Sequence, residues 1–406
     1  MVDTLTNRRN FLRFAAASPL FAGTPALAQV AADPMVWAPR ELDRLITDPK
    51  QALDVFDFEP AMHEKVPPAH FGYMTTGIDD EVTLRANRAG FQEFQLLPRR
   101  LIDVSKIDMR TEILGTTFDS PIFVCPTASN KAYHPEGETA VAKAARAGNH
   151  LEMLSTVATT SIEDAIAARG GPVWYQLYPT SKWDIAVALA KRAESAGCQT
   201  IVITVDGLAQ QNWETLARLR RIDTRQCKDC HGTTLQSYLA RKPNFDGIDL
   251  TGAGFNAVGF TWDSVRRLRD IAKTKIVLKG ILATEDAKLA ADAGIDAIIL
   301  SNHGGRNDDN GRSTIDALPG IVEAAGGRMK VLVDSGFRRG TDIVKALALG
   351  ATAVGIGRPY LWGLGAFGQP GVERVLEILR RETHAVMQQM GAPTIKDLVP
   401  SMVRRA

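Results

Sequence analysis

The sequence predicts an α/β protein, a closed (β/α)8 TIM barrel with an N-terminal helical extension. From residue 121 onward, short β-branched apolar runs alternate with amphipathic helical patterns, and this alternation occurs eight times. The apolar runs are continuous, as is typical of parallel strands buried on both faces. Eight consecutive βα units, together with the lack of a Gly-x-Gly-x-x-Gly turn, favour a closed barrel over the alternative of an open doubly wound sheet.

The barrel domain is expected to span residues 121–406. Its strands are read at Pro121–Ala128, Leu151–Val157, Val173–Tyr178, Thr200–Asp206, Lys275–Lys279, Ala297–Asn302, Lys330–Gly336 and Ala353–Gly357. The helices between and after them are read at Glu138–Ala147, Ser161–Arg169, Trp183–Ala196, Trp262–Ala272, Thr284–Ala293, Thr314–Ala325, Gly340–Leu349 and Val372–Gln389. Each helix carries an apolar stripe that is able to cover the sheet.

Two further regions flank or interrupt this pattern. Residues 29–120 are expected to form an extension packed on the barrel, helical around Arg40–Glu64 and Asp79–Arg88. The connection from residue 207 to residue 260 is the longest loop, and it leaves the carboxyl end of the fourth strand. Long loops at that end of a barrel are usually functional.

The composition is that of a soluble globular protein. Of the 406 residues, 45% are hydrophobic and 23% are charged, which excludes a disordered or fibrous chain. Lys and Arg number 48 against 46 acidic residues, so the formal net charge is only +2. Without a basic excess we expect no nucleic-acid partner.

The first 28 residues are predicted to be a twin-arginine export signal. Arg8 and Arg9 precede a mildly apolar run over residues 14–27, and residues 26–28 read Ala-Leu-Ala, a sequence that signal peptidase accepts. The alternative is a basic, disordered N-terminus. Twin-arginine export predicts a periplasmic protein that crosses the membrane folded, with a tightly held cofactor already loaded.

Polar residues gather at the carboxyl ends of the expected strands, where barrels assemble their active sites. They are Thr127, Ser155, Gln176, Tyr178, Thr204, Asp206, Lys279, Ser301, His303, Arg306, Asp334, Arg338, Gly357 and Arg358. Burying such groups without partners is costly, so the cluster favours a ligand. The turns over residues 334–340 and 355–359 offer backbone amides, helix N-termini and arginines, and predict a phosphate site; the alternative is tight turns with surface arginines.

Several short segments together resemble the FMN-dependent 2-hydroxy acid oxidase and dehydrogenase family, which includes glycolate oxidase, lactate dehydrogenase and mandelate dehydrogenase. The segments are Leu101–Ser105, Pro126–Ala128, His134–Glu138, Gln176–Tyr178, Thr204–Asp206, Leu278–Gly280, Ser301–Arg306 and Arg338–Asp342. The resemblance runs from about Tyr73 to the end of the chain, and the Ser-Asn-His-Gly-x-Arg segment is its most specific element.

The resemblance implies FMN as cofactor and assigns it a set of residues. The expected cofactor site comprises Arg338, Gly357 and Arg358 at the phosphate, Ser155, Gln176 and Thr204 on the ring, Thr127 and Ala128 beside N5, Lys279 as the cation near N1, and also Ser301 and Asp334. A cation near N1 suits the negative charge that accumulates there on reduction.

The resemblance also implies a catalytic set around His303, which would act as general base on the substrate. Asp206 would orient His303, Tyr178 and Tyr73 would hydrogen-bond the substrate, and Arg306 would pair with its carboxylate. Both hydride transfer and a carbanion mechanism stay open. Members of the family are commonly tetrameric, so a homo-oligomer is expected.

One position departs from the family pattern. Trp213 stands where the resemblance implies a second arginine on the substrate carboxylate. Losing that partner would cost about 2–5 kcal/mol, so small 2-hydroxy acids are expected to bind weakly. Trp213 is able to stack on an aromatic or larger substrate, and Arg218, Arg220 or Arg221 are alternative cations.

The long loop contains Cys227, Cys230 and His231 in the order of a c-type haem attachment motif. Covalent haem c, a disulfide or free thiols, and a metal site completed from elsewhere remain three alternatives. The other two cysteines, Cys125 and Cys198, are expected to be small buried hydrophobes.

The leading functional reading is FMN-dependent oxidation of a 2-hydroxy acid to the 2-oxo acid. The expected electron acceptor is a cytochrome c or a quinone, and dioxygen is an alternative. A second reading is a flavin-binding protein of the same fold that acts on a non-carboxylate or amine substrate, or that lacks turnover of small acids. A third is a phosphate-sugar barrel enzyme without flavin.

Overall fold

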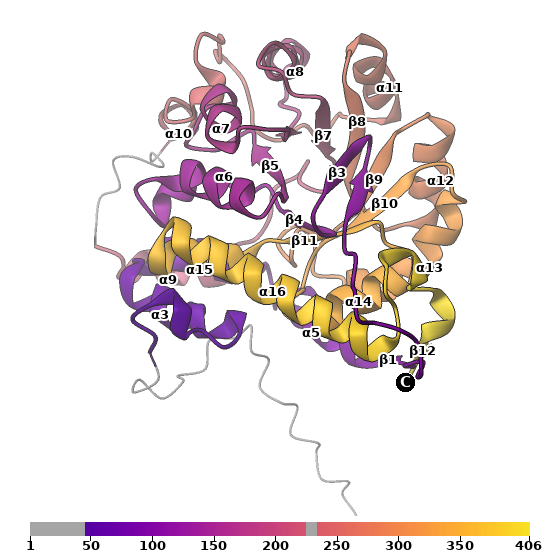
Figure 1. Ribbon diagram of the computed structural model, residues 1–406. Coiled ribbons are helices and arrows are strands. Elements are labelled where there is room, and N and C mark those ends of the chain that lie inside the picture. The colour runs from indigo at the N-terminus through magenta and orange to yellow at the C-terminus, as the bar shows by residue number, and fades with distance from the viewer. Residues whose placement is uncertain (1–44, 225–233) are drawn as a thin grey trace, which may run out of the picture. The chain divides into compact units, whose positions relative to one another are not determined.

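Eight parallel strands close into the barrel that the sequence predicts (Figure 1). The computed structural model describes residues 45–224 and 234–406. The first strand of the barrel pairs in parallel with the last, with Val354 beside Ile122, which completes the closure. The strands are β4 (Ile122–Val124), β5 (Leu151–Ser155), β6 (Val173–Leu177), β7 (Thr200–Thr204), β8 (Lys275–Ile281), β9 (Ala297–Leu300), β10 (Lys330–Val333) and β11 (Ala353–Ile356).

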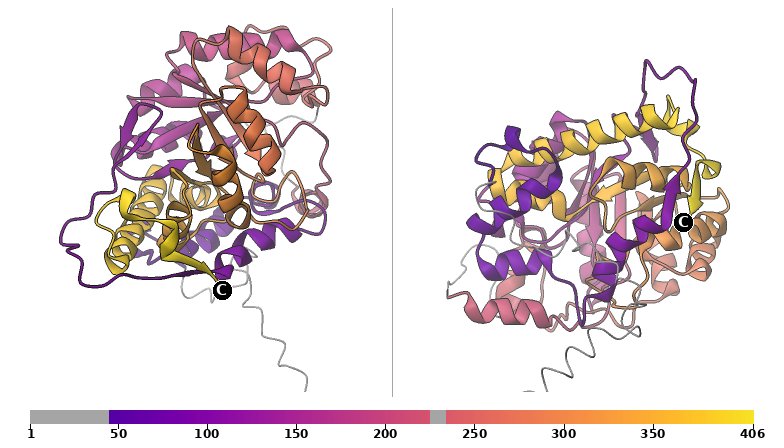
Figure 2. Two further views of the ribbon diagram at one scale, coloured as in Figure 1. Left: turned by 90° about the vertical axis from the view of Figure 1, so that its right-hand side faces the viewer. Right: turned by 90° about the horizontal axis from the view of Figure 1, so that it is seen from below.

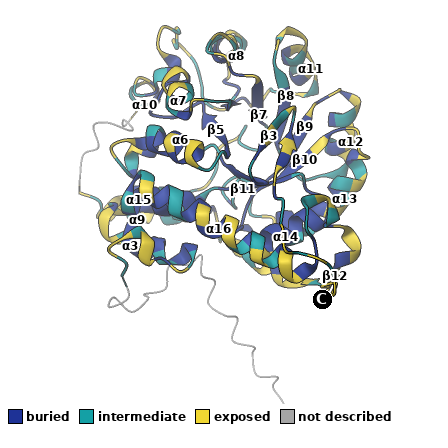
Figure 3. Cartoon of the chain, in the orientation of Figure 1, coloured by how far each residue is buried: buried dark blue, intermediate teal, exposed yellow. Residues whose placement is uncertain are grey.

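The strands are largely apolar on both faces, and both faces are buried (Figure 3). Phe123, Met153 and Trp174 belong to the cluster that fills the barrel interior. Their sequence neighbours Val124 and Leu154 point the other way and pack in the larger cluster beneath the helices. Fully burying one such side chain contributes about 1.5–3 kcal/mol, so both layers hold the barrel together.

All eight helices expected around the barrel are present, with ends that shift by a few residues. They are α6 (Gly137–Ala147), α7 (Ile162–Arg169), α8 (Trp183–Ser195), α11 (Trp262–Ile271), α12 (Thr284–Asp292), α13 (Thr314–Ala325), α14 (Gly340–Ala348) and α16 (Gln369–Met390). Local sequence sets the ends of α7: the Ser161 hydroxyl accepts from the amide of Asp164, and Gly170 ends the helix at φ +60°.

The helical extension differs from the prediction in its first part. Instead of one helix over Arg40–Glu64, the described residues form two short 3₁₀ turns, Pro49–Gln51 and Val55–Asp57, before α3 (Phe58–Lys65). The carboxylates of Asp48 and Asp54 cap these turns and stop a longer helix from forming. Residues 40–44 lie outside the described residues. The second expected helix is present as α5 (Val82–Ala89), and α4 (Pro68–Thr75) precedes it.

Two small sheets connect the extension with the barrel end. A hairpin of β2 (Thr111–Ile113) and β3 (Thr116–Phe118) adds Ile113 and Phe118 to the interior cluster of the barrel. The short strands β1 (Phe94–Leu96) and β12 (Val403–Arg405) pair antiparallel near the C-terminus, as both views of Figure 2 show. The C-terminal residues are therefore tied to the extension.

The long connection after β7 is partly helical, which the sequence reading did not predict. It contains α9 (Glu214–Ile222) and α10 (Leu235–Leu239). Gly72 of α4 allows Leu219 of α9 to approach closely, since a Cβ there would lie 2.4 Å from the leucine Cδ1. Cys227, Cys230 and His231 lie outside the described residues. Within the described ranges, no helix combines the length and the apolar character that a bilayer crossing needs.

Candidate active site

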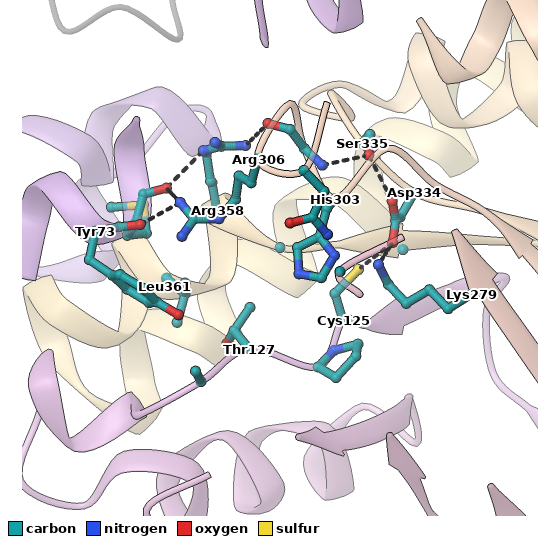
Figure 4. A pocket seen from close by; sticks show the side chains of 18 of the residues that line it. Tyr73, Cys125, Thr127, Lys279, His303, Arg306, Asp334, Ser335, Arg358 and Leu361 are labelled. Atoms are coloured by element: carbon teal, nitrogen blue, oxygen red, sulfur yellow. Dashed lines mark hydrogen bonds and ion pairs between the residues drawn. The ribbon is translucent and has the colours of Figure 1, made fainter. Parts of the chain in front are cut away.

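A cavity of about 350 Å³ opens at the carboxyl ends of the strands, where the sequence places the functional residues. Figure 4 shows His303 in its centre, with Arg306 and Arg358 on one side and Lys279, Asp334 and Cys125 on the other. The expected site residues that line this cavity are Tyr73, Thr127, Ala128, Tyr178, Trp213, Lys279, His303, Arg306, Asp334, Arg338, Gly357 and Arg358.

Behind His303 lies Asp206, with its Oδ1 3.0 Å from Nδ1 of the imidazole. The amide of Asn307 donates to the same carboxylate oxygen over 2.9 Å. Gly280, at φ +107°, makes room for this carboxylate, because a Cβ there would lie 2.6 Å from Cβ and Cγ of Asp206. His303 itself has φ +57°, a left-handed conformation that turns its ring into the cavity.

The imidazole and the carboxylate differ in how the site affects their protonation. Burial lowers the pKa of His303 below its usual value, and Asp206 only partly opposes this. Burial alone would raise the pKa of Asp206, but His303 and Lys279 outweigh it and the pKa is lowered. A neutral imidazole therefore faces the cavity at neutral pH while an anion lies behind it, which is the arrangement of an oriented general base.

Tyr178 presents its hydroxyl to the other side of the imidazole, 3.1 Å from Nε2 of His303. Burial raises the pKa of Tyr178 well above its ordinary value, so the hydroxyl keeps its proton. The ring packs against Phe255 with a centroid separation of 5.3 Å. Tyr178 is thus held as a hydrogen-bond donor beside the basic nitrogen.

Lys279 supplies a permanent cation on the opposite wall. Its Nζ lies 2.8 Å from Oγ of Ser301 and 3.4 Å from Oδ2 of Asp334. Burial disfavours the charge, but Asp334 and Asp206 outweigh it and raise the pKa of the lysine. Burial raises the pKa of the neighbouring Cys125 well above its usual range, so this thiol stays neutral. A charged Lys279 is able to stabilise negative charge that develops on a ligand.

The three residues expected on the flavin ring come from successive strands and bond to one another. Ser155 Oγ donates to Oε1 of Gln176 over 3.0 Å, and Nε2 of Gln176 donates to Oγ1 of Thr204 over 2.8 Å. All three are buried, and they lie outside the set that lines the cavity. Ser301 and Asp206 also lie outside the cavity lining. Ser301 bonds to Lys279 and Asp206 bonds to His303, so each contacts a residue that does line the cavity.

Arg338 and Arg358 lie at the end of the cavity formed by the turns after β10 and β11, and Arg306, from the turn after β9, is close enough to affect Arg358. Burial lowers the pKa of Arg358, and its neighbours Arg306 and Arg338 lower it further. Arg358 donates to the main-chain oxygens of Met74, Thr76 and Gly304 at 2.9–3.1 Å, which fixes its position. The neighbouring guanidinium groups repel one another, and a bound anion would offset this repulsion. A phosphate monoester is an anion that arginines bind well.

Arg306 is held by two aromatic rings and by the main chain. Its guanidinium carbon lies 4.4 Å from the ring centroid of Trp213 and 4.8 Å from that of Tyr73. The two rings are nearly parallel, 18° apart, with centroids separated by 6.2 Å. Nη1 of Arg306 donates to the oxygens of Tyr73 and Thr76. The alternative cations Arg218, Arg220 and Arg221 lie on α9 and are exposed, away from the cavity lining.

The loop that carries His303 is fastened to α5 of the extension. Asn87 and Asn302 exchange two amide hydrogen bonds, of 2.9 and 2.8 Å, and both are buried. Gly305, at φ +74°, packs so closely on α5 that a Cβ would lie 2.5 Å from the amide nitrogen of Leu84. The position of the base therefore depends on a helix from outside the barrel.

Sequence reasoning missed several residues of the cavity. Tyr238 and Phe255 line it from the long loop, whose path the sequence pattern does not specify. Asn307 follows Arg306 directly in the chain, and this adjacency was the only signal for it. Cys125 is buried as expected, and it also lines the cavity beside Asp334. Leu361 belongs to α15 (Arg358–Phe367), a helix that lacks the polar face that would reveal it in the sequence.

The arrangement fits FMN. Arg338 and Arg358 would hold the phosphate, Lys279 would stabilise negative charge on the reduced ring, and the cavity between them has largely apolar walls. Because the strand ends supply the phosphate-binding groups, the site has the placement that barrels use for phosphate cofactors.

Comparisons with known proteins agree with this fit. The family model described as FMN-dependent dehydrogenase matches residues 62–405. A peroxisomal (S)-2-hydroxyacid oxidase of Arabidopsis thaliana is 39% identical over 87% of this chain and 97% of its own. The L-lactate oxidase of Lysinibacillus sphaericus is 40% identical over 84% and 90%, respectively.

Solved structures give the same result. A chimera of (S)-mandelate dehydrogenase superposes with a TM-score of 0.79 at 35% identity, covering 87% of this chain and 99% of its own. A mandelate oxidase variant, crystallised with 2-hydroxy-phenylacetamide, has a TM-score of 0.76 at 34% identity and covers 87% and 98%. Together with the site geometry, these matches show that the chain belongs to the FMN-dependent dehydrogenase family of 2-hydroxy acid oxidases and dehydrogenases.

Proposed function

We propose that this FMN-dependent oxidoreductase oxidises a 2-hydroxy acid, or a larger relative of one, to the 2-oxo compound, and that its electrons pass to a respiratory acceptor. The observation that carries the proposal is the pairing of His303 with Asp206 at 3.0 Å in the same cavity as Lys279 and the three arginines. A base, a permanent cation and an anion site are the groups that this oxidation requires.

Each protein group has a distinct part in the reaction. The neutral Nε2 of His303 takes the proton from the substrate, and Asp206 stabilises the imidazolium that results. Tyr178 donates to the substrate oxygen on the same side, and Arg306 holds the carbonyl or carboxylate end. FMN, when bound, accepts the two electrons of the oxidation. Lys279 stabilises the negative charge that reduction creates.

His303→Gln tests the base directly. We expect FMN to stay bound while its anaerobic reduction by substrate slows by a factor of about 10² to 10⁴, the usual contribution of a general base. His384→Gln, on the outer helix α16, is the control and should behave as wild type. Wild-type reduction by the His303 variant would remove this residue from the role.

The twin-arginine segment over residues 1–28 supports an exported protein that meets a cytochrome c or a quinone in the periplasm. The intact mass of the protein purified from the periplasm tests this, since a cleaved leader lowers the mass by that of residues 1–28. The same spectrum reports whether haem is attached at Cys227 and Cys230, or whether the two thiols form a disulfide. Steady-state rates with cytochrome c, a quinone and dioxygen identify the acceptor.

A second candidate is a flavoprotein of the same fold that does not turn over small acids. Trp213 beside Arg306 is the observation that favours it, because the side chain at position 213 that stacks on this guanidinium is an uncharged indole and adds no cation for a carboxylate. Anaerobic bleaching of the flavin by a panel of 2-hydroxy acids separates the two functions. Reduction by any member of the panel supports the oxidation that we propose.

A further inference from the structure

The substrate end of the cavity is enclosed by aromatic side chains that are themselves fixed. Two pairs of rings line it: Tyr73 stacks on Trp213, and Tyr178 packs on Phe255. Tyr238 adds a fifth ring, and the ammonium of buried Lys242 lies 4.5 Å from its centroid. These contacts give the long loop a defined inner face, so an aromatic ligand finds a formed surface.

Of the cations that line the cavity in the described residues, one is available to the substrate. Lys279 is paired with Asp334, and Arg338 and Arg358 lie at the turns where a phosphate fits. Arg306 is the cation left for the substrate among the described residues that line the cavity. Its Nη1 already donates to the main-chain oxygens of Tyr73 and Thr76, which leaves its other donors for a ligand.

Trp213 determines how Arg306 is used. The indole lies against the guanidinium at 4.4 Å and fixes its plane, but it brings no charge of its own. A carboxylate in this apolar enclosure would have one cation for two oxygens, and burying an anion with incomplete compensation is unfavourable. A neutral carbonyl needs one donor only, which Arg306 provides.

We propose that the site prefers neutral derivatives of aromatic 2-hydroxy acids, esters or amides, over free small 2-hydroxy acids, and that Trp213 determines this preference. The inference rests on the proposed function. In the reaction the C–H and O–H bonds at the 2-position break and a C=O double bond forms. Two electrons and one proton pass to FMN, and the second proton passes to His303.

Four compounds separate the contribution of charge from that of the ring: mandelate, its methyl ester, lactate and its methyl ester. The readout is kcat/KM for anaerobic reduction of the bound FMN in the holoenzyme. We expect methyl mandelate to exceed both mandelate and lactate by at least tenfold, and to exceed methyl lactate because only the former carries a ring. Equal or better reduction by mandelate or lactate would overturn the inference while leaving the proposed function intact. If all four fail to bleach the flavin, the inference fails, and the wider panel of 2-hydroxy acids decides whether the proposed function fails with it.

Two variants at position 213 test the role of the indole. Trp213→Arg adds the second cation, and we expect the ratio of mandelate to methyl mandelate to rise at least tenfold. Trp213→Phe keeps an aromatic ring, and it should retain the wild-type order of the four compounds. FMN content, read from the absorbance spectrum, verifies that each variant folds. An unchanged ratio in folded Trp213→Arg would remove Trp213 as the determinant.

Trp183 offers a matched control, because the guanidinium carbon of Arg267 lies 4.1 Å from its ring centroid in a similar cation–π contact outside the cavity. Trp183→Phe should leave the order of the four compounds unchanged. A change as large as that of Trp213→Arg would mean that the preference does not arise in the cavity, and would overturn the inference.

Discussion

The carboxylate of Asp206 holds the imidazole of His303 from behind, with 3.0 Å between Oδ1 and Nδ1. This bond leaves Nε2 facing Tyr178 and the cavity. The same carboxylate is the main influence that raises the pKa of His303 against the effect of burial. Orientation and proton affinity of the base therefore depend on one contact.

Asp206→Asn should slow flavin reduction by a factor of about 10² to 10⁴. The amide is nearly isosteric, but it cannot stabilise the imidazolium, and it does not favour the tautomer that the carboxylate selects. Stopped-flow absorbance under anaerobic conditions measures the rate. FMN content should equal that of the wild type, and a rate within threefold of the wild type would contradict the role of Asp206.

The pH dependence of kcat/KM should show an acid limb with its midpoint below the ordinary histidine value of 6.5, because burial lowers the pKa of His303. The base works only when it is neutral, so activity is present above this pKa and is lost as the pH falls through it. Asp206→Asn removes the influence that raises the pKa. We expect its acid limb to move to still lower pH, and a shift to higher pH would refute this assignment.

Gly280→Ala should displace the carboxylate of Asp206, because the new Cβ would lie 2.6 Å from its Cβ and Cγ. We expect slower flavin reduction together with a loss of stability of about 1 kcal/mol or more from the strained φ of +107°. Gly197→Ala is the matched control, since Gly197 has a similar φ of +96° and nothing within 4 Å of the added Cβ. It should lower the melting temperature without changing the rate. Equal effects of the two substitutions on the rate would contradict the prediction.

Arg358→Gln should weaken FMN binding by at least tenfold, or about 1.4 kcal/mol, because the anion site loses a buried cation that three main-chain bonds hold in place. Titration of the apoprotein with FMN, followed by flavin fluorescence, gives the dissociation constant. Arg328→Gln is the control, since Arg328 pairs with Asp292 on the outer surface. Unchanged affinity in the Arg358 variant would place the phosphate elsewhere.

The barrel was predictable because strands that are buried on both faces appear in the sequence as continuous apolar runs. The run of β9 is apolar at every position, and that of β7 is apolar between its two terminal threonines, since both faces of the sheet are covered. The first part of the extension was not predictable in the same way. There Asp48 and Asp54 bond to the backbone of their own segment, and these local bonds compete with the helix that composition favours.

The site was predictable to the extent that a residue's place along a strand fixes its place in space. His303 and Arg358 follow strand ends and Lys279 lies near the carboxyl end of β8, so the closure of the barrel brings them together. Tyr238 and Phe255 come from a long connection, whose course depends on tertiary packing. Likewise, the sequence identifies Trp213 but not its partner. Its contact with Arg306 depends on where α9 and the extension place the two side chains.

The paired amides of Asn87 and Asn302 mean that the catalytic unit is larger than the cylinder of strands. A fragment starting at residue 121 would retain all eight barrel strands and the phosphate-binding residues named above, yet the turn bearing His303 would lose its external brace. Recombination between relatives should therefore exchange α5 and the turn that bears His303 together. A junction between them would combine an Asn87 region from one parent with an Asn302 region from the other, and the two were not selected to fit each other.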